Sequence, residues 1–142
     1  MRGYHDLPEA TAETIVDGGW LRTGDLVTMD ERGYLRIAGR LKEMIVSGAL
    51  NIFPLEIESV LTGHPGVALA AVLGVPDRRW GEEVVAVLQP AAGGSIDVAA
   101  VEAWARERLA PYKIPKRWVI VDEMPLTATG KVQKFVLREG LG

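Results

Sequence analysis

The 142-residue sequence contains no cysteine, which excludes disulfide bonds, thiol catalysis and cysteine-ligated metals. Its two histidines, His5 and His64, have no second ligand at metal-binding spacing, so we predict no metal site. Charge of neither sign is in large excess. Sixteen basic and nineteen acidic side chains give a net charge of -3, and this balance does not suit a nucleic-acid-binding surface.

The sequence also lacks the run of about 20 apolar residues that a membrane span requires. The longest uncharged apolar stretch, near residues 67–75, is far shorter and contains a glycine. Residues 1–11 lack the apolar segment of a signal peptide, so we expect a cytoplasmic protein. The sequence does contain 48% hydrophobic and 25% charged residues, which is typical of a soluble globular protein.

Hydrophobic periodicity predicts the secondary structure. Alternating residues indicate a β-hairpin with strands at 26–29 and 34–38 around a polar turn. A helix is predicted to begin at Pro54 and to end at Gly63, because proline suits the first helical position and glycine the end. Further elements follow from the same patterns: strands at 67–73, 84–88 and 118–122, and a helix between 95 and 109 capped by Asp97 or Ser95.

This order of elements predicts an α+β fold. Residues 42–142 would form a small C-terminal domain with a three-stranded sheet flanked by helices. Residues 1–41 are too short and too hairpin-like to build a core of their own. We therefore interpret them as the end of a larger N-terminal domain.

One lysine, Lys131, lies on a glycine-threonine turn in the stretch PLTATGKVQK, residues 125–134. A phosphate-binding P-loop would need a glycine where Pro125 stands and a serine or threonine where Val132 stands. The turn therefore does not hold a triphosphate by itself. A phosphate that meets Lys131 must be held by another part of the protein.

Five motifs occur in order along the chain: GWLRTGDL (19–26), GYLRIAGRLKEMI (33–45), LNIFPLEIE (50–58), LAPYKIP (109–115) and PLTATGK (125–131). Together they resemble the C-terminal part of the adenylate-forming enzymes, and most of all that of their acyl-CoA synthetases. The resemblance implies that a carboxylic acid is activated by ATP to acyl-AMP and then transferred to CoA. It also implies a mobile C-terminal domain that is inactive without its N-terminal domain, which would hold most of the Mg²⁺ contacts, the phosphate loop and the acyl pocket.

The resemblance assigns roles to four residues. Lys131 would be catalytic, Asp25 and Arg40 would bind the nucleotide, and Lys42 would be the hinge between the domains. Each also has a structural interpretation. Asp25 could form a turn before the hairpin, and the three basic residues could be solvated surface side chains.

The resemblance also points to a CoA site with Gly48, Trp80 and Tyr112. The two aromatic side chains could stack on adenine, although packing in loops explains them equally well. The stretch SGALN departs from the family pattern, which has glycine in place of Ala49. If that position has a positive φ, or lies beside the path of pantetheine, Ala49 would strain the loop or narrow the passage.

Two other functions fit the same residues. One is an adenylation domain that loads a carrier protein, which a downstream carrier domain would reveal. The other is a non-catalytic ligand-binding α+β module, which would not need Asp25, Arg40 and Lys131 together. The pocket that selects the acid would lie in the N-terminal domain.

Overall fold

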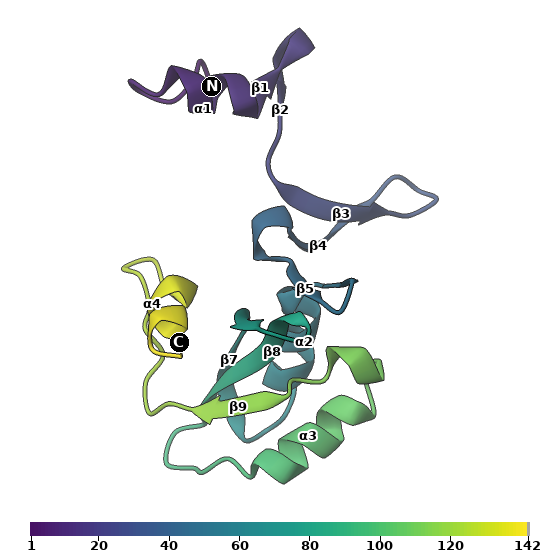
Figure 1. Cartoon of the computed structure of the whole chain (residues 1–142), viewed down its shortest axis with the longest axis vertical. Coiled ribbons are helices and arrows are strands. Elements are labelled where there is room, and N and C mark those ends of the chain that lie inside the picture. Colours follow the sequence, from purple (N-terminus) through teal and green to yellow (C-terminus); the bar gives the residue numbers. More distant parts are fainter. Residues whose placement is uncertain (142) are drawn as a thin grey trace. The chain divides into compact units, whose positions relative to one another are not determined.

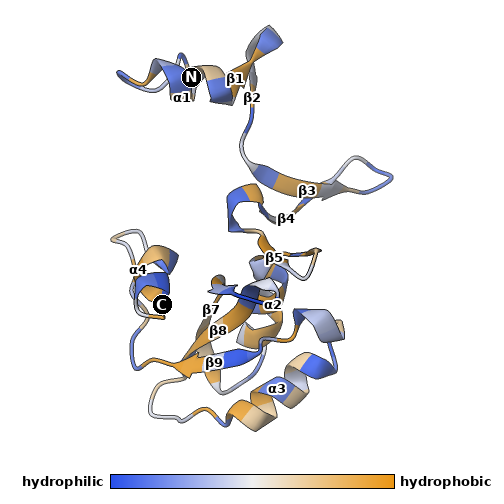
Figure 2. Cartoon of the chain, viewed as in Figure 1, coloured by the Kyte–Doolittle hydropathy of each residue, from blue (hydrophilic) through white to orange (hydrophobic). Residues whose placement is uncertain are grey.

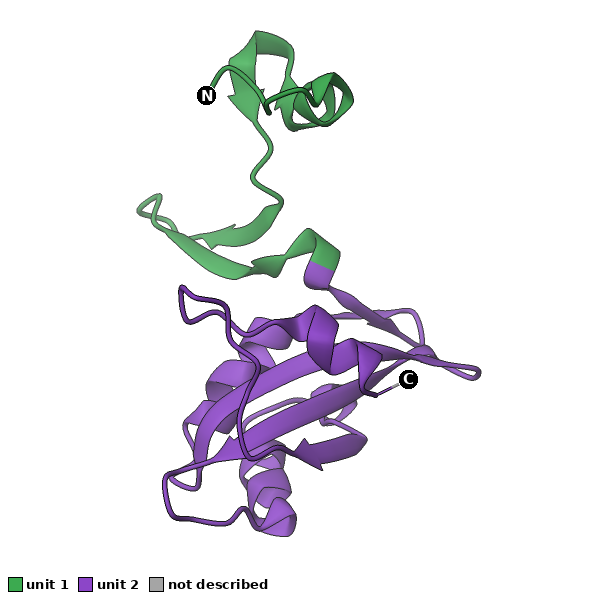
Figure 3. Ribbon diagram, turned by 90° about the vertical axis from the view of Figure 1, so that its left-hand side faces the viewer, with its two compact units in different colours: residues 1–42 green, residues 43–142 purple. Residues whose placement is uncertain are grey.

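The computed structural model describes residues 1–141 and contains two compact units, residues 1–42 and 43–142 (Figure 3). Figure 1 labels most of the helices and strands along the chain. None of the helices in residues 1–141 has the combination of length and hydrophobicity that a bilayer crossing requires.

The first unit consists of small, separate elements. Helix α1 (Pro8–Thr14) is followed by the two-residue strands β1 (Ile15–Val16) and β2 (Trp20–Leu21), none of which the sequence had predicted. Strands β3 (Asp25–Met29) and β4 (Leu35–Arg40) then form an antiparallel hairpin, which confirms the sequence prediction.

An aspartate explains the hairpin turn. Asp30 Oδ1 accepts hydrogen bonds from the backbone N–H groups of Arg32 and Tyr34, both at 2.9 Å. This pattern, in which an aspartate side chain replaces a backbone acceptor, is typical of turns.

The first unit buries no hydrophobic core. Within residues 1–141, every buried hydrophobic side chain lies between Ile45 and Leu137. Large apolar side chains on the hairpin and on β2 are instead exposed, among them Trp20, Met29 and Tyr34. Where exposed apolar side chains form a contiguous surface, that surface often contacts another protein surface.

The second unit is built on a five-stranded sheet, not on the three strands that the sequence predicted. Strands β5 (Ile45–Ser47) and β6 (Leu50–Ile52) form an additional short hairpin. Three residues are too few to show an alternating pattern, so the sequence did not reveal them. Strands β7 (Val67–Asp77) and β8 (Gly81–Pro90) are antiparallel, and β9 (Arg117–Ile120) pairs with β8 in parallel.

Helices cover both faces of this sheet. Alternate residues of β8 point to opposite sides, so that Val84 and Ala86 pack in one hydrophobic cluster while Val85 and Val87 pack in the other. Helices α2 (Pro54–Thr62) and α3 (Val98–Arg106) pack in the first cluster, and α4 (Lys134–Glu139) contributes Leu137 to the second. Figure 2 shows the hydrophobic residues concentrated along β7 and β8.

The helix ends follow the expected signals. Pro54 occupies the first turn of α2, and Asp97 caps α3 by accepting a hydrogen bond from the Ala99 N–H at 3.0 Å. The α+β class predicted from the sequence is confirmed. Helix α4 was not predicted because it has only six residues and no side-chain cap.

Candidate functional site

Lys131 lies in a closed loop, residues 125–133, which we call the Lys131 loop. An isolated antiparallel β-bridge between Leu126 and Val132 joins the two ends of this loop. Lys131 N–H donates to Thr127 Oγ1 at 3.1 Å, and Thr127 N–H donates to the Lys131 carbonyl at 2.8 Å. Gly130 has a φ of 79°, a left-handed conformation that favours glycine. The backbone of Lys131 is therefore held on both sides by the loop itself.

The side chain of Lys131 is exposed and forms no ion pair with any carboxylate of residues 1–141. A second hydroxyl joins the loop, since Thr129 Oγ1 lies 2.9 Å from Thr127 Oγ1. The loop thus presents one ammonium group on a hydrogen-bonded turn. Such a group can stabilise negative charge that a substrate brings.

Asp25 and Arg40 lie opposite each other at the ends of β3 and β4. Arg40 Nε donates to Asp25 Oδ1 at 3.0 Å, an ion pair that the sequence did not predict. Asp25 N–H also donates to Thr23 Oγ1 at 3.1 Å. The pair presents a carboxylate oxygen and further guanidinium N–H groups side by side, a combination that suits a ligand with both hydroxyl and phosphate groups.

Lys42 is exposed and lies in the 3₁₀ helix Leu41–Glu43, directly at the division between the two compact units. Backbone Leu41 N–H donates to the Gly24 carbonyl at 2.9 Å, which ties the end of the hairpin down just before this residue. Lys42 has no such backbone contact to a distant residue in the part of the chain described here. Its role as a hinge stays a prediction.

Gly48 and Trp80 are in direct contact. A Cβ atom on Gly48 would lie 2.7 Å from Trp80 Cε3, closer than real side chains approach, so only glycine allows the indole ring this position. Gly48 N–H also donates to the Trp80 carbonyl at 2.8 Å. The sequence named both residues for the same site, and the structure brings them together.

Ala49 follows Gly48 in the two-residue turn between β5 and β6, where Ser47 pairs with Leu50. The φ angles of Gly48 and Ala49 are 57° and 65°. Two positive values define a type I′ turn, which is favoured by glycine and asparagine and strained by alanine. This φ confirms the backbone strain expected at Ala49, whereas its effect on CoA stays a prediction.

Replacing Ala49 by glycine should therefore stabilise the protein by about 1 kcal/mol, because glycine adopts a positive φ without steric cost. Urea unfolding monitored by tryptophan fluorescence would measure the change. Ala92→Gly is a matched control, since Ala92 is exposed and does not have a positive φ, and it should slightly destabilise the protein. Equal effects of the two substitutions would contradict the strain at Ala49.

Trp80 carries two cations on its ring. Arg79 Cζ lies 4.8 Å and Lys116 Nζ lies 4.4 Å from the ring centroid, and the side chain of Trp80 is 39% exposed. Asp77 Oδ1 accepts the backbone N–H groups of Trp80 and Arg79 at 2.8 and 2.9 Å. These two hydrogen bonds, that from Trp80 first, hold the pKa of the Asp77 carboxyl below its usual value.

Tyr112 lies in the 3₁₀ helix Pro111–Lys113, and it is 47% exposed. Its neighbour Lys113 is held by both oxygens of Glu56, at 2.6 and 2.7 Å. This hydrogen-bonded carboxylate raises the pKa of Lys113 above its usual value. Lys113 is therefore engaged within the protein, whereas Lys116 and Arg79 stay close to the exposed Trp80 ring.

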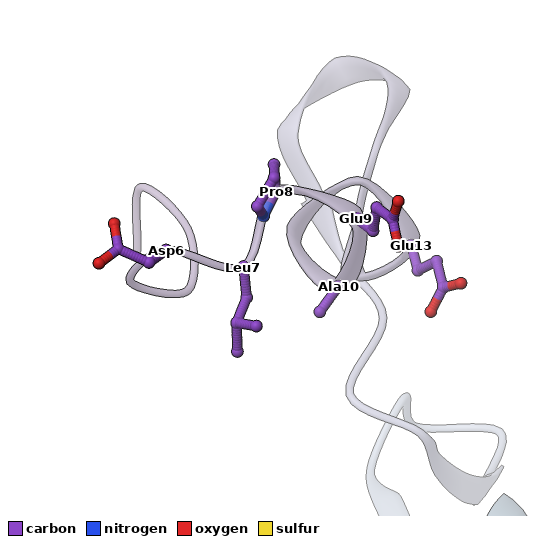
Figure 4. Close-up of a pocket in the computed structure, with 6 residues that line it drawn as sticks. All are labelled: Asp6, Leu7, Pro8, Glu9, Ala10 and Glu13. Atoms are coloured by element: carbon purple, nitrogen blue, oxygen red, sulfur yellow. The ribbon is translucent and has the colours of Figure 1, made fainter.

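A pocket in the first unit is lined by residues outside this set, namely Asp6, Leu7, Pro8, Glu9, Ala10 and Glu13 (Figure 4). Figure 4 shows Asp6 pointing away from Glu9 and Glu13, so the three carboxylates do not converge. No group of three histidine or carboxylate side chains within residues 1–141 is placed to hold a metal ion.

Sequence reasoning missed Lys134, the first residue of α4. Its ammonium lies 2.9 Å from Glu43 Oε2 and 2.8 Å from Glu58 Oε1. Helical spacing could not link these residues, because Lys134 and Glu43 are 91 positions apart. The only local signal is a basic residue at the beginning of a helix, where acidic residues are usual.

The sequence profile of the family described as AMP-binding enzyme C-terminal domain matches residues 56–131. The chain belongs to this family. The resemblance inferred from the five motifs is thereby confirmed. The matched segment contains Trp80 and Tyr112 and ends at Lys131, while the other four candidate residues lie before it.

Relatives of this AMP-binding C-terminal domain include acyl-CoA-forming enzymes. Feruloyl-CoA synthase of an Amycolatopsis species is 49% identical over the whole chain, which spans 29% of that enzyme's length. Long-chain-fatty-acid–CoA ligase FadD13 of Mycobacterium tuberculosis is 44% identical over 98% of the chain, or 27% of its own length. The chain thus spans less than a third of these relatives.

Solved structures of similar proteins also match this chain over less than a third of their own length. ATP-bound MatB from Rhodopseudomonas palustris superposes with a TM-score of 0.88 and 44% identity over 98% of this chain and 28% of its own. The amide bond synthetase McbA from Marinactinospora thermotolerans has a TM-score of 0.88 and 41% identity over 99% of this chain and 29% of its own. The C-terminal parts of these proteins share the fold described above.

Proposed function

We propose that this chain is the C-terminal part of an AMP-forming acyl-CoA synthetase. In the first step, a carboxylate oxygen attacks the α-phosphorus of ATP, and pyrophosphate leaves to give acyl-AMP. In the second step, the CoA sulfur attacks the acyl carbon and AMP leaves. The observation that carries the proposal is Lys131, an exposed ammonium on a hydrogen-bonded glycine turn in a domain of this family.

Lys131 would reduce the electrostatic repulsion that opposes the first step. A carboxylate and a triphosphate repel each other strongly once water is excluded from between them. A fixed ammonium between the two anions offsets this repulsion and stabilises the charge of the transition state. The lysine side chain supplies this positive charge directly, so the role requires no neighbouring base.

Asp25 and Arg40 would hold the nucleotide in this proposal. The free oxygen of Asp25 can accept the ribose hydroxyls, and the remaining N–H groups of Arg40 can donate to ribose or phosphate oxygens. Their ion pair orients both groups before the nucleotide binds. Gly48, Trp80 and Tyr112 would receive CoA, with the cations on the Trp80 ring available to its phosphates.

The proposal includes a large preceding domain that supplies the acyl pocket, the phosphate loop and the Mg²⁺ ligands. Two observations support it. The chain spans 29% of a curated relative, and its first unit leaves large apolar side chains exposed. A cytoplasmic location belongs to the same proposal, since ATP and CoA are metabolites of the cell interior.

An acceptor other than CoA is the second candidate. Ala49 replaces a glycine of the family pattern in the turn that contacts Trp80, and an amide bond synthetase is among the similar structures. Supplying the full-length protein with acyl-AMP and either CoA or a primary amine would distinguish the two acceptors. Amide without thioester would replace the first proposal by the second.

The function is tested by comparing the 142-residue chain with the full-length protein. We expect the full-length protein to release pyrophosphate from ATP with a suitable acid and to form acyl-CoA. The chain alone should release none, because it has no loop that holds the triphosphate. Pyrophosphate release with a panel of aromatic and fatty acids measures both. Pyrophosphate release by the isolated chain would contradict the proposal that the preceding domain is required for adenylation.

A further inference from the structure

Lys134 connects three parts of the second unit. Its ammonium lies between Glu43 and Glu58, at 2.9 and 2.8 Å from their carboxylate oxygens. The side chains of Lys134 and Glu58 are 23% and 17% exposed, so the Lys134–Glu58 pair is shielded from water more than the other ion pairs of the unit, whereas Glu43 is 43% exposed. Shielding strengthens the attraction between the charges and reduces its screening by salt.

The two carboxylates differ in how they are held. Glu58 lies on α2, and its Oε1 also accepts the Val72 N–H of β7 at 2.8 Å. It is therefore attached to the sheet. Glu43 instead ends the 3₁₀ helix Leu41–Glu43 and follows Lys42 directly, so its position depends on the backbone torsions there.

Lys134 also adjoins the Lys131 loop. The preceding residue, Gln133, closes that loop through two hydrogen bonds: its N–H donates to the Pro125 carbonyl at 2.8 Å, and its Nε2 donates to the Leu126 carbonyl at 2.7 Å. The ammonium of Lys134 thus ties the base of the Lys131 loop to α2 on one side and to Glu43 on the other.

Local helix stability does not explain this lysine. It is the first residue of α4, and the partial positive charge of a helix N-terminus favours acidic side chains there. Lys134 instead pairs with Glu58 and Glu43, which precede it in the sequence by 76 and 91 positions. These carboxylates neutralise the positive charge that the helix N-terminus disfavours. The reason for a cation at this position is the contact between distant segments.

We propose that Lys134 is a positioning residue for adenylation, which keeps the Lys131 loop in a fixed orientation relative to the residue that follows the hinge. A change in the torsions at Lys42 then moves Glu43, Lys134 and the Lys131 loop together. This inference rests on the proposed role of Lys131. Without the pairing, the fold persists but the Lys131 ammonium is delivered with less precision.

The test is Lys134→Met in the full-length protein, which removes the charge and keeps an unbranched apolar chain. We expect the rate of acyl-AMP formation to fall about tenfold to a hundredfold, because small misplacements of a catalytic group are costly. Formation of thioester from supplied acyl-AMP should change little. Lys134→Arg should recover most of the loss, since arginine can pair with both carboxylates.

Three further variants make the result specific. Arg138→Met, at an exposed position of the same helix, is the matched control and should behave as the unmodified protein. Glu43→Gln should reproduce part of the loss, and combining it with Lys134→Met should add less than the separate effects predict. Glu43 is more exposed than Lys134, so this variant carries the test if Lys134→Met fails to fold.

The outcomes separate this inference from the proposed function. If Lys131→Ala leaves adenylation unchanged, the proposed function fails. If Lys131→Ala strongly slows adenylation while Lys134→Met and Glu43→Gln match Arg138→Met, only the positioning role is overturned. If Lys134→Met slowed adenylation and thioester formation equally, Lys134 would only support the fold, and the positioning role would be overturned.

Discussion

Lys131→Ala in the full-length protein is expected to slow acyl-AMP formation about a hundredfold to a thousandfold, the usual effect of losing one preorganised electrostatic contact. Transfer of a supplied acyl-AMP to CoA should stay close to its original rate. The difference arises because the positive charge is needed only where the carboxylate and the α-phosphate meet. By the second step, pyrophosphate has left and the acyl carbon faces a different nucleophile.

The structure indicates that Lys131→Ala removes the ammonium group without disturbing the loop. The side chain of Lys131 is exposed, and the hydrogen bonds that shape its loop come from backbone atoms and from Thr127. Removing an exposed side chain of this kind usually changes stability by less than about 0.5 kcal/mol. A loss of activity would therefore not reflect unfolding, and thermal unfolding of the variant would verify this.

The two half-reactions must be measured separately, adenylation by pyrophosphate release in a single turnover and transfer by thioester formation from synthetic acyl-AMP. Lys116→Ala is a useful counterpart, since Lys116 lies on the Trp80 ring and would affect CoA transfer. We expect the two variants to impair opposite steps. Equal losses in both steps for Lys131→Ala would indicate that this lysine is structural.

The sequence predicted the elements that have a long, regular pattern. The hairpin at Asp25–Met29 and Leu35–Arg40, helix α2 beginning at Pro54 and the Asp97 cap of α3 were all recognisable from local physical chemistry. Strand β7 extends further than predicted, to Asp77, and contains Pro76. A proline is tolerated there because β7 is at an edge of the sheet, which only the tertiary structure reveals.

The sequence named the candidate residues but not the contacts between them. The family resemblance assigned Gly48 and Trp80 to the same candidate site, yet their contact depends on a glycine whose absent Cβ leaves room for the ring. The pairing of Asp25 with Arg40 follows from hairpin register, which a sequence pattern determines only approximately. Lys134 escaped notice because its partners are distant in sequence and its helix is short.

Lys42→Pro should separate the two half-reactions. The Lys131 loop and the turn at Gly48 lie on different segments of the second unit, and one fixed orientation is not expected to present both to the same acyl group. A rotation between the two steps would resolve this, and it requires backbone torsions that can change. Lys42 is exposed at the division between the two units, where such a change would disturb few packed side chains.

Proline at position 42 restricts these torsions in two ways. It holds its own φ near about −65°, which a 3₁₀ helix accepts, and it disfavours helical torsions at the preceding residue, Leu41. The hinge is then confined to the orientation that tolerates both restrictions. One half-reaction should continue near its normal rate while the other falls by orders of magnitude, with the fold of the second unit intact.

Single-turnover rates of adenylation and of thioester formation, measured separately on the full-length variant, would test this expectation. Lys42→Ala is the control, because it removes the same charge and leaves the backbone free to rotate, so both steps should continue. If Lys42→Pro and Lys42→Ala behave alike, the backbone at this residue is not the pivot and the hinge must lie elsewhere. If only the proline variant loses one step, the restriction of φ is the cause, since the two variants differ in backbone freedom and share the loss of charge.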